Sequence, residues 1–149
     1  MVIVFDYILN FAIEKNIKPE VDNLSGNIMK GGKMSQLFSN ILLELKKVDG
    51  VKMVALAGHD GYLIGEQASE DKELLTLMSA TMLKAAEKVT NRLENVSPKR
   101  VIVDFDGGKV IAEPAGAKAL VLVTVSPDAN IEPIISELER TCCRIKDIS

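Results

Sequence analysis

Two aspartates after an apolar run are the side chains of this sequence best spaced for chemistry. Residues 101–103 form the run, which continues as the Asp-x-Asp-Gly sequence Asp104-Phe105-Asp106-Gly107. Asp104 could act as a nucleophile towards phosphorus, with Asp106 as the acid and base beside it. The pattern also predicts a β-hairpin, because an Asp-Gly pair next to an apolar strand supplies the positive φ that a tight turn requires.

The same run resembles the nucleophile motif of the haloacid dehalogenase phosphatases. It departs from that motif at Gly108, where the family has Thr or Val. The 43 residues after Asp106 also offer no downstream pair of acids for magnesium in a parallel-sheet setting. A calcium loop is excluded too, since its spaced oxygen ligands and terminal Glu are absent. We therefore predict a hairpin turn, and a phosphatase that uses Asp104 and Asp106 stays only as an alternative.

No metal, catalytic-triad or cofactor motif stands out among the other reactive side chains. Lys30–Lys33 resembles a phosphate-binding loop, but Gly32 stands where that loop needs its Lys. His59, the only histidine, has no nucleophile beside it in the sequence. The adjacent Cys142 and Cys143 are too few for a zinc site and indicate reduced thiols, hence the cytoplasm. We expect no cofactor and no metal.

The length and composition indicate a single globular domain. The chain has 149 residues, of which 47% are hydrophobic and 26% charged, and its net charge is −3. A weakly acidic chain lacks the clustered basic surface typical of nucleic-acid binding. No apolar run reaches the roughly 18 residues that cross a membrane. We expect neither a nucleic-acid partner nor a membrane span.

The spacing of apolar residues predicts helices and strands after an N-terminal segment. Residues 1–33 combine an apolar start with a Gly-containing linker, and we assign residues 34–149 to one domain. Steps of three and four residues predict helices, and short apolar or alternating runs predict strands. The predicted helices begin near Met34, Ser69 and Asn130, and the predicted strands are Val51–Ala57, Tyr62–Glu66, Val101–Phe105, Lys109–Glu113 and Ala119–Val125.

Two of these strands indicate how the chain is layered. Val51–Ala57 and Ala119–Val125 are apolar on both alternating faces, which is typical of strands covered on both sides. Three predicted helices are available as covers. The sequence therefore predicts an α/β (α+β) fold with a five-stranded, mostly antiparallel sheet between helices.

The long predicted helix and one strand indicate association with another chain. Thr76, Ala80 and Leu83 lie on a side of the helix where small residues would let a second backbone approach. Val101–Phe105, if it is an edge strand, lacks the Lys, Pro or bulge that prevents pairing, so we include its alternate residues Val101, Val103 and Phe105 in the interface. We assign the core side of the helix to Leu74, Met78, Met82, Ala85, Val89, Leu93 and Val96.

With this order of elements, the sequence resembles the roadblock family of dynein light chain relatives. The resemblance begins in residues 43–51, a helix end leading to a strand, and in the Asp-Gly turn of residues 57–62. It continues in the long helix around residues 80–93 and in the Val-rich strand of residues 120–125. The order and spacing of these segments carry the resemblance, which spans residues 34–147.

The resemblance implies a profilin-like sandwich with strand order 2-1-5-4-3, a long helix on one face and two other helices on the opposite face. It also implies homodimers or heterodimers formed through the edge strand and the long helix. Members bind and regulate small Ras-like GTPases or act as scaffolds, without a catalytic centre. Neither Arg92 nor Arg100 is placed by the sequence as an inserted catalytic finger.

We therefore expect a non-catalytic, cytoplasmic, dimeric regulator or scaffold that binds a small Ras-like GTPase. A small-molecule sensor domain of similar architecture is the main alternative. Such a sensor would need an apolar pocket, and polar residues inside its strand pattern would be its sign in the sequence. Few such residues occur in the predicted strands.

Overall fold

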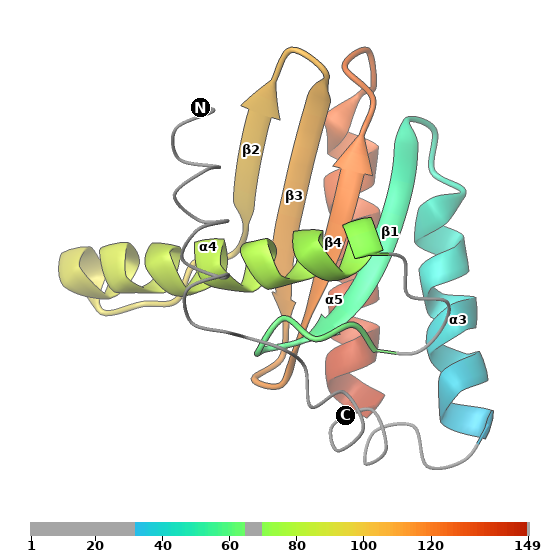
Figure 1. Cartoon of the computed structure of the whole chain (residues 1–149), viewed down its shortest axis with the longest axis horizontal. Coiled ribbons are helices and arrows are strands. Elements are labelled where there is room, and N and C mark those ends of the chain that lie inside the picture. The colour runs from blue at the N-terminus through green and yellow to red at the C-terminus, as the bar shows by residue number, and fades with distance from the viewer. Residues whose placement is uncertain (1–31, 65–69, 149) are drawn as a thin grey trace.

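The computed structural model describes residues 32–64 and 70–148. Helix α4 (Glu70–Glu94) crosses one face of a sheet, and α3 (Gly32–Lys46) and α5 (Ile131–Ile148) cover the other face (Figure 1). The predicted N-terminal segment, residues 1–33, lies outside the described residues except for its last two, which belong to α3.

The sheet is antiparallel and has four strands in the order β1-β4-β3-β2. This order agrees with the one that the resemblance implies, once the second predicted strand is left out. The bounds of the strands are β1 Val51–Gly58, β2 Val101–Phe105, β3 Gly108–Ala115 and β4 Ala119–Val125.

The second predicted strand, Tyr62–Glu66, is the error in the predicted sheet. The described part of this segment, residues 62–64, follows the edge of β1 through a single bridge between Leu63 and Ala57. The backbone N–H of Gly58 donates to the carbonyl of Tyr62 at 2.8 Å, and that of Ile64 donates to Leu56 at 2.8 Å. This contact is too short for a strand, and the sequence continues with Gly65, a weak strand former.

Strand β4 is central and buried on both faces, as its sequence predicts, whereas β1 forms an edge of the sheet and is fully buried only over residues 55–58. In β4, Val121 and Val123 pack with α3 and α5, whereas Leu120 and Leu122 pack on the α4 side. All four side chains are at most 1% exposed. Strand β4 therefore lies between two apolar layers, one on each side of the sheet.

The side of α4 that packs on the sheet differs from the prediction. Thr76, Ser79, Ala80 and Leu83 are buried, and Ala80 and Leu83 belong to the apolar cluster beneath the helix. The hydroxyl of Thr76 donates to the carbonyl of Glu73 at 3.0 Å, and that of Ser79 donates to Leu75 at 2.7 Å. Because these hydroxyls bond within the helix, small polar residues can be buried there.

The predicted core side of α4 was wrong at Leu74, which is 39% exposed, and over the C-terminal half of the helix. Met78 is buried as predicted, but Ala85 is exposed, and Val89 and Leu93 are 59% and 76% exposed. Figure 1 shows the reason: α4 lies across the strands, and its last turns extend beyond β2, where there is no sheet to cover them.

Among the described residues, no helix is long and apolar enough to cross a membrane.

A buried leucine of α4 and an exposed leucine of α3 predict different costs of truncation. Leu83→Ala should lower the free energy of unfolding by about 2–5 kcal/mol, because it leaves a cavity between α4 and the sheet. Leu43→Ala, at a position on α3 that is 50% exposed, should change it by less than about 0.5 kcal/mol. Chemical denaturation of both variants measures the difference, and equal values would contradict the described packing of α4.

Candidate interaction surface

Strand β2 forms an edge of the sheet, as predicted, and its outer side is open. A two-residue turn joins β2 to β3, so the residues beside the turn form a hydrogen-bonded pair and alternate pairs follow. Val101, Val103 and Phe105 therefore exchange backbone hydrogen bonds with β3. The N–H and C=O groups of Ile102 and Asp104 point away from the sheet. This edge can accept another strand.

The side chains of the predicted edge residues lie on the α4 side of β2. Val101 packs against the apolar cluster beneath α4, whereas Phe105 is 47% exposed and Val103 is partly exposed. On the other side of the strand, Ile102 is 41% exposed. Both faces of this edge thus present apolar surface next to unpaired backbone groups.

The helical part of the predicted interface lies in the core of the protein. Thr76, Ala80 and Leu83 are at most 3% exposed, so a second chain could reach them only by separating α4 from the sheet. The outward side of α4 carries instead an apolar row of Ala85, Val89 and Leu93, spaced by four residues. The signal missed in the sequence is the spacing of small residues at 76, 79 and 80, which marks the side in close contact.

The connection from α4 to β2 is held in place by backbone and hydroxyl contacts. Asn95 adopts a positive φ of 58°, a conformation that commonly ends a helix. The hydroxyl of Thr90 donates to the carbonyl of Val96 at 2.5 Å. These contacts turn the chain from the end of α4 towards the edge strand.

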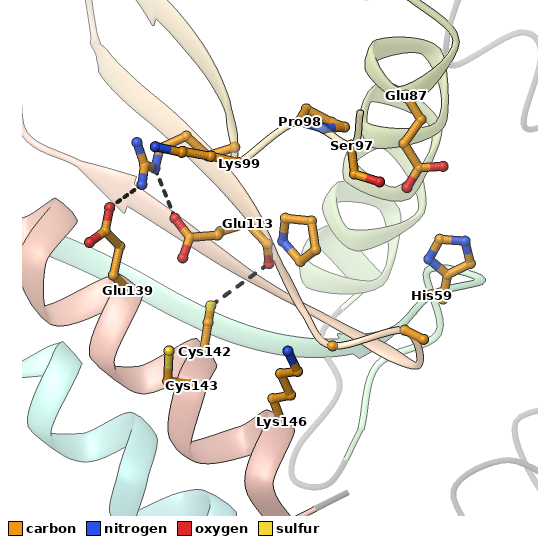
Figure 2. Close-up of a pocket in the computed structure, with 14 residues that line it drawn as sticks. His59, Glu87, Ser97, Pro98, Lys99, Glu113, Glu139, Cys142, Cys143 and Lys146 are labelled. Carbon is orange, nitrogen blue, oxygen red and sulfur yellow. Dashed lines mark hydrogen bonds and ion pairs between the residues drawn. The ribbon is translucent and has the colours of Figure 1, made fainter. Parts of the chain in front are cut away.

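Arg100 fixes the start of β2 to the rest of the fold, and its two contacts are the dashed lines that reach Glu113 and Glu139 in Figure 2. Its Nε donates to Oε1 of Glu113 at 2.8 Å, and its Nη2 donates to Glu139 on α5. The buried Glu113 carboxylate is the main cause that raises the pKa of Arg100. Since two carboxylates of its own chain hold this guanidinium, Arg100 is not free to reach into a partner.

A cavity of about 1000 Å³ opens beside this ion pair, where β3 continues past the start of β2. Pairing of the two strands ends at Ala112, and Pro114, which has no N–H to donate, follows on β3. The lining includes three carboxylates and three cations, Glu87, Glu113, Glu139, Lys99, Arg100 and Lys146. The sensor alternative needs an apolar pocket, and this lining mixes the six charged groups with apolar surface from Pro98, Pro114, Ala117 and Cys142.

The two adjacent cysteines differ in environment. Cys142 is buried and its Sγ donates to the backbone carbonyl of Glu113 at 3.9 Å, while Cys143 is exposed (Figure 2). Burial raises the pKa of the Cys142 thiol far above its ordinary value. Both thiols are free.

The remaining chemical candidates lie at exposed turns or edges. The predicted hairpin is confirmed, with Asp106 in its turn and Asp104 on β2, where Asp104 Oδ1 lies 3.5 Å from Nζ of Lys109. His59 is exposed in the turn after β1 and lines the cavity. Over residues 32–64 and 70–148, no group of three His, Cys, Asp or Glu side chains is placed to hold a metal ion.

The order of the elements, the open edge and the crossing helix agree with one known family. A sequence model of the Roadblock/LC7 domain matches residues 24–125. The chain belongs to the Roadblock/LC7 domain family. The resemblance predicted from the sequence is therefore confirmed.

Relatives and solved structures extend this assignment. The uncharacterized protein MJ0714 of Methanocaldococcus jannaschii is 28% identical over 115 residues, which cover 76% of this chain and 97% of that protein. A structure of MglB with a tetrameric arrangement has a TM-score of 0.70 at 13% identity, covering 76% of this chain and 88% of that chain. The Roadblock/LC7 domain from Streptomyces avermitilis has a TM-score of 0.66 at 14% identity, and the match covers 76% of this chain and 94% of that chain. At these identities, the solved structures establish the fold of this roadblock domain.

The buried thiol of Cys142 predicts a pH dependence of stability. An unfolded chain loses this proton near pH 8.5, whereas the folded protein keeps it because burial raises the pKa. The contribution of the protonated Cys142 thiol to the free energy of unfolding is therefore full below about pH 8. It is lost as the pH rises, by on the order of 1 kcal/mol per pH unit above about pH 9. Chemical unfolding between about pH 7 and 10 should show a steeper decline for the wild type than for Cys142→Ala. Identical slopes would contradict this role.

Proposed function

We propose that this roadblock domain is a non-catalytic dimeric regulator or scaffold, acting in the cytoplasm, that binds a small Ras-like GTPase. Membership of the family supports the class of partner, because the roadblock resemblance implies GTPase regulation or assembly. The open edge of β2 is the single observation that carries the dimer. The free thiols of Cys142 and Cys143 agree with a reducing compartment.

The dimer is built by pairing the β2 strands of two copies in antiparallel orientation. The outward N–H and C=O groups of Ile102 and Asp104 supply the hydrogen bonds. Pairing Asp104 with Asp104 would place like charges opposite each other, which is unfavourable. Pairing Asp104 of one copy with Ile102 of the other avoids this repulsion and centres the two-fold axis on Val103.

The overhanging end of α4 supports the same arrangement. The last turns of α4 extend past β2, towards the side where a second copy would lie (Figure 1). The apolar row, with Val89 59% and Leu93 76% exposed, is available there to pack against the second copy. Self-association is also found in the MglB structure with a tetrameric arrangement, whose fold this chain shares.

Regulation in this proposal works by preferential binding and needs no catalytic group. A regulator shifts a GTPase between its nucleotide states only by the difference in its affinity for them. Arg100 is engaged by Glu113 and Glu139 of its own chain, so it does not serve as an inserted catalytic finger. The dimer surface would act by favouring one conformation of the switch loops.

Asp104→Pro should convert the dimer to a monomer without unfolding the protein. Proline removes the outward N–H of residue 104, which β3 does not use, and so blocks the edge alone. Light scattering over a range of concentrations should give twice the chain mass for the wild type and the single mass for the variant.

Asp104→Ala is the matched control, because it removes the charge and keeps the N–H, and it should remain dimeric. Circular dichroism checks that both variants are folded. A wild-type monomer at high concentration, or a folded Asp104→Pro variant that stays dimeric, would contradict pairing through β2.

A direct binding experiment tests the class of partner. Each Ras-like GTPase encoded in the source genome is purified with GDP or with a non-hydrolysable GTP analogue and titrated into the full-length protein by calorimetry. We expect one GTPase to bind with an affinity that differs by about tenfold or more between its two nucleotide states, equivalent to about 1.4 kcal/mol. Equal affinities would make the protein a scaffold and not a regulator, and binding to none would contradict the proposal.

A further inference from the structure

A row of three cations runs along the exposed side of α4. Lys84, Lys88 and Arg92 are spaced by four residues, so they lie one above the other on the helix surface. All three are exposed. We call them the basic row. The row is visible in the sequence, but only the orientation of α4 shows that it lies outside the core.

No ion pair joins the basic row to a carboxylate in the part of the chain that the structure describes, although Glu87 lies three residues from Lys84 on the same helix. The ion pairs found there join Arg100 with Glu113 and Glu139, Lys109 with Asp104, and Arg144 with Glu44. Cations spaced by four residues repel one another and destabilise a helix slightly. The row therefore concentrates positive charge on a protein whose net charge is −3.

The position of the basic row favours a protein partner. It runs directly beside the apolar row of Ala85, Val89 and Leu93, one residue away along the helix. An apolar strip bordered by charge is the usual composition of a protein interface, with a polar rim around an apolar centre. Three cations are fewer than the four to eight that typically bind an anionic membrane surface.

We propose that the basic row docks an acidic face of the partner protein, alongside the seam between the two copies. This inference rests on the proposed function and names the chemistry of the surface that the GTPase presents. The two rows then divide the outer side of α4. The apolar row packs against the second copy, and the basic row borders that seam and faces the partner.

The test reverses the row in the full-length protein. The variant Lys84→Glu, Lys88→Glu, Arg92→Glu should bind the GTPase identified by calorimetry at least about tenfold more weakly, because like charges then face each other. The dependence of the wild-type affinity on salt should also become weaker in the variant. The control Lys47→Glu, Lys118→Glu, Arg140→Glu makes the same change in net charge at exposed positions on other elements and should bind within about twofold of the wild type.

Three further measurements separate the remaining outcomes. Light scattering should give the same dimer mass for the row variant, and a monomer would show that the row joins the two copies, which overturns the inference. Row-dependent binding to phosphatidylglycerol vesicles would assign the row to a membrane and would overturn the inference too.

If no GTPase binds, poly-L-glutamate serves as the acidic probe. In that case the GTPase proposal has failed, and weaker binding of the row variant alone would still support an acidic partner for the basic row. Equal weakening in the control variant would overturn this inference as well.

Discussion

The close contact between α4 and the sheet sets the orientation on which the outer surface depends. Under the helix, the surface of the sheet is formed by Ala55, Ala57 and Ala112. The facing side of the helix also carries small residues, namely Ala80, Thr76 and Ser79. Gly61 adds a second close approach, since a Cβ at this position would lie 2.8 Å from the Cα of Leu77. Larger side chains would push the helix away or rotate it. This contact therefore decides which residues of α4 remain outside.

The two edges of the sheet differ in how many of their backbone groups are open to another strand. This difference makes β2 the edge at which a second chain can pair. At the β1 edge, Leu56 and Gly58 already bond to the chain that returns at residues 62–64. On β3, the stretch beyond Ala112 carries Pro114, which has no N–H for a further strand. β2 has neither protection along Val101–Phe105. The same edge lies beneath the overhanging end of α4, so unpaired backbone and exposed apolar side chains occur together.

Four of the five predicted strands are confirmed, whereas the strand Tyr62–Glu66 and the sheet-facing side of the long helix were predicted wrongly. The Asp106-Gly107 turn and the two-sided apolar pattern of β4 are local signals, and both the β2–β3 hairpin and the central position of β4 are confirmed. The sheet-facing side of α4 depends on the small residues opposite it, which lie far away in the sequence. Thr76 also counts as polar by type, although its hydroxyl is satisfied within the helix. The stripe that includes Val89 and Leu93 therefore looked more like a core than the true one.

Pairing of two copies would also change what α4 offers to a partner. One protomer carries a single basic row, and a two-fold axis through Val103 would bring a second row to the same side of the joined sheets. A partner that touched both rows would bind the second one at a high effective concentration, so its affinity would exceed that for one row. By linkage, the partner would in turn favour the dimer by the same factor. Because the edge of β2 lies apart from the basic row, a change at this edge can alter partner binding without any contact to the partner.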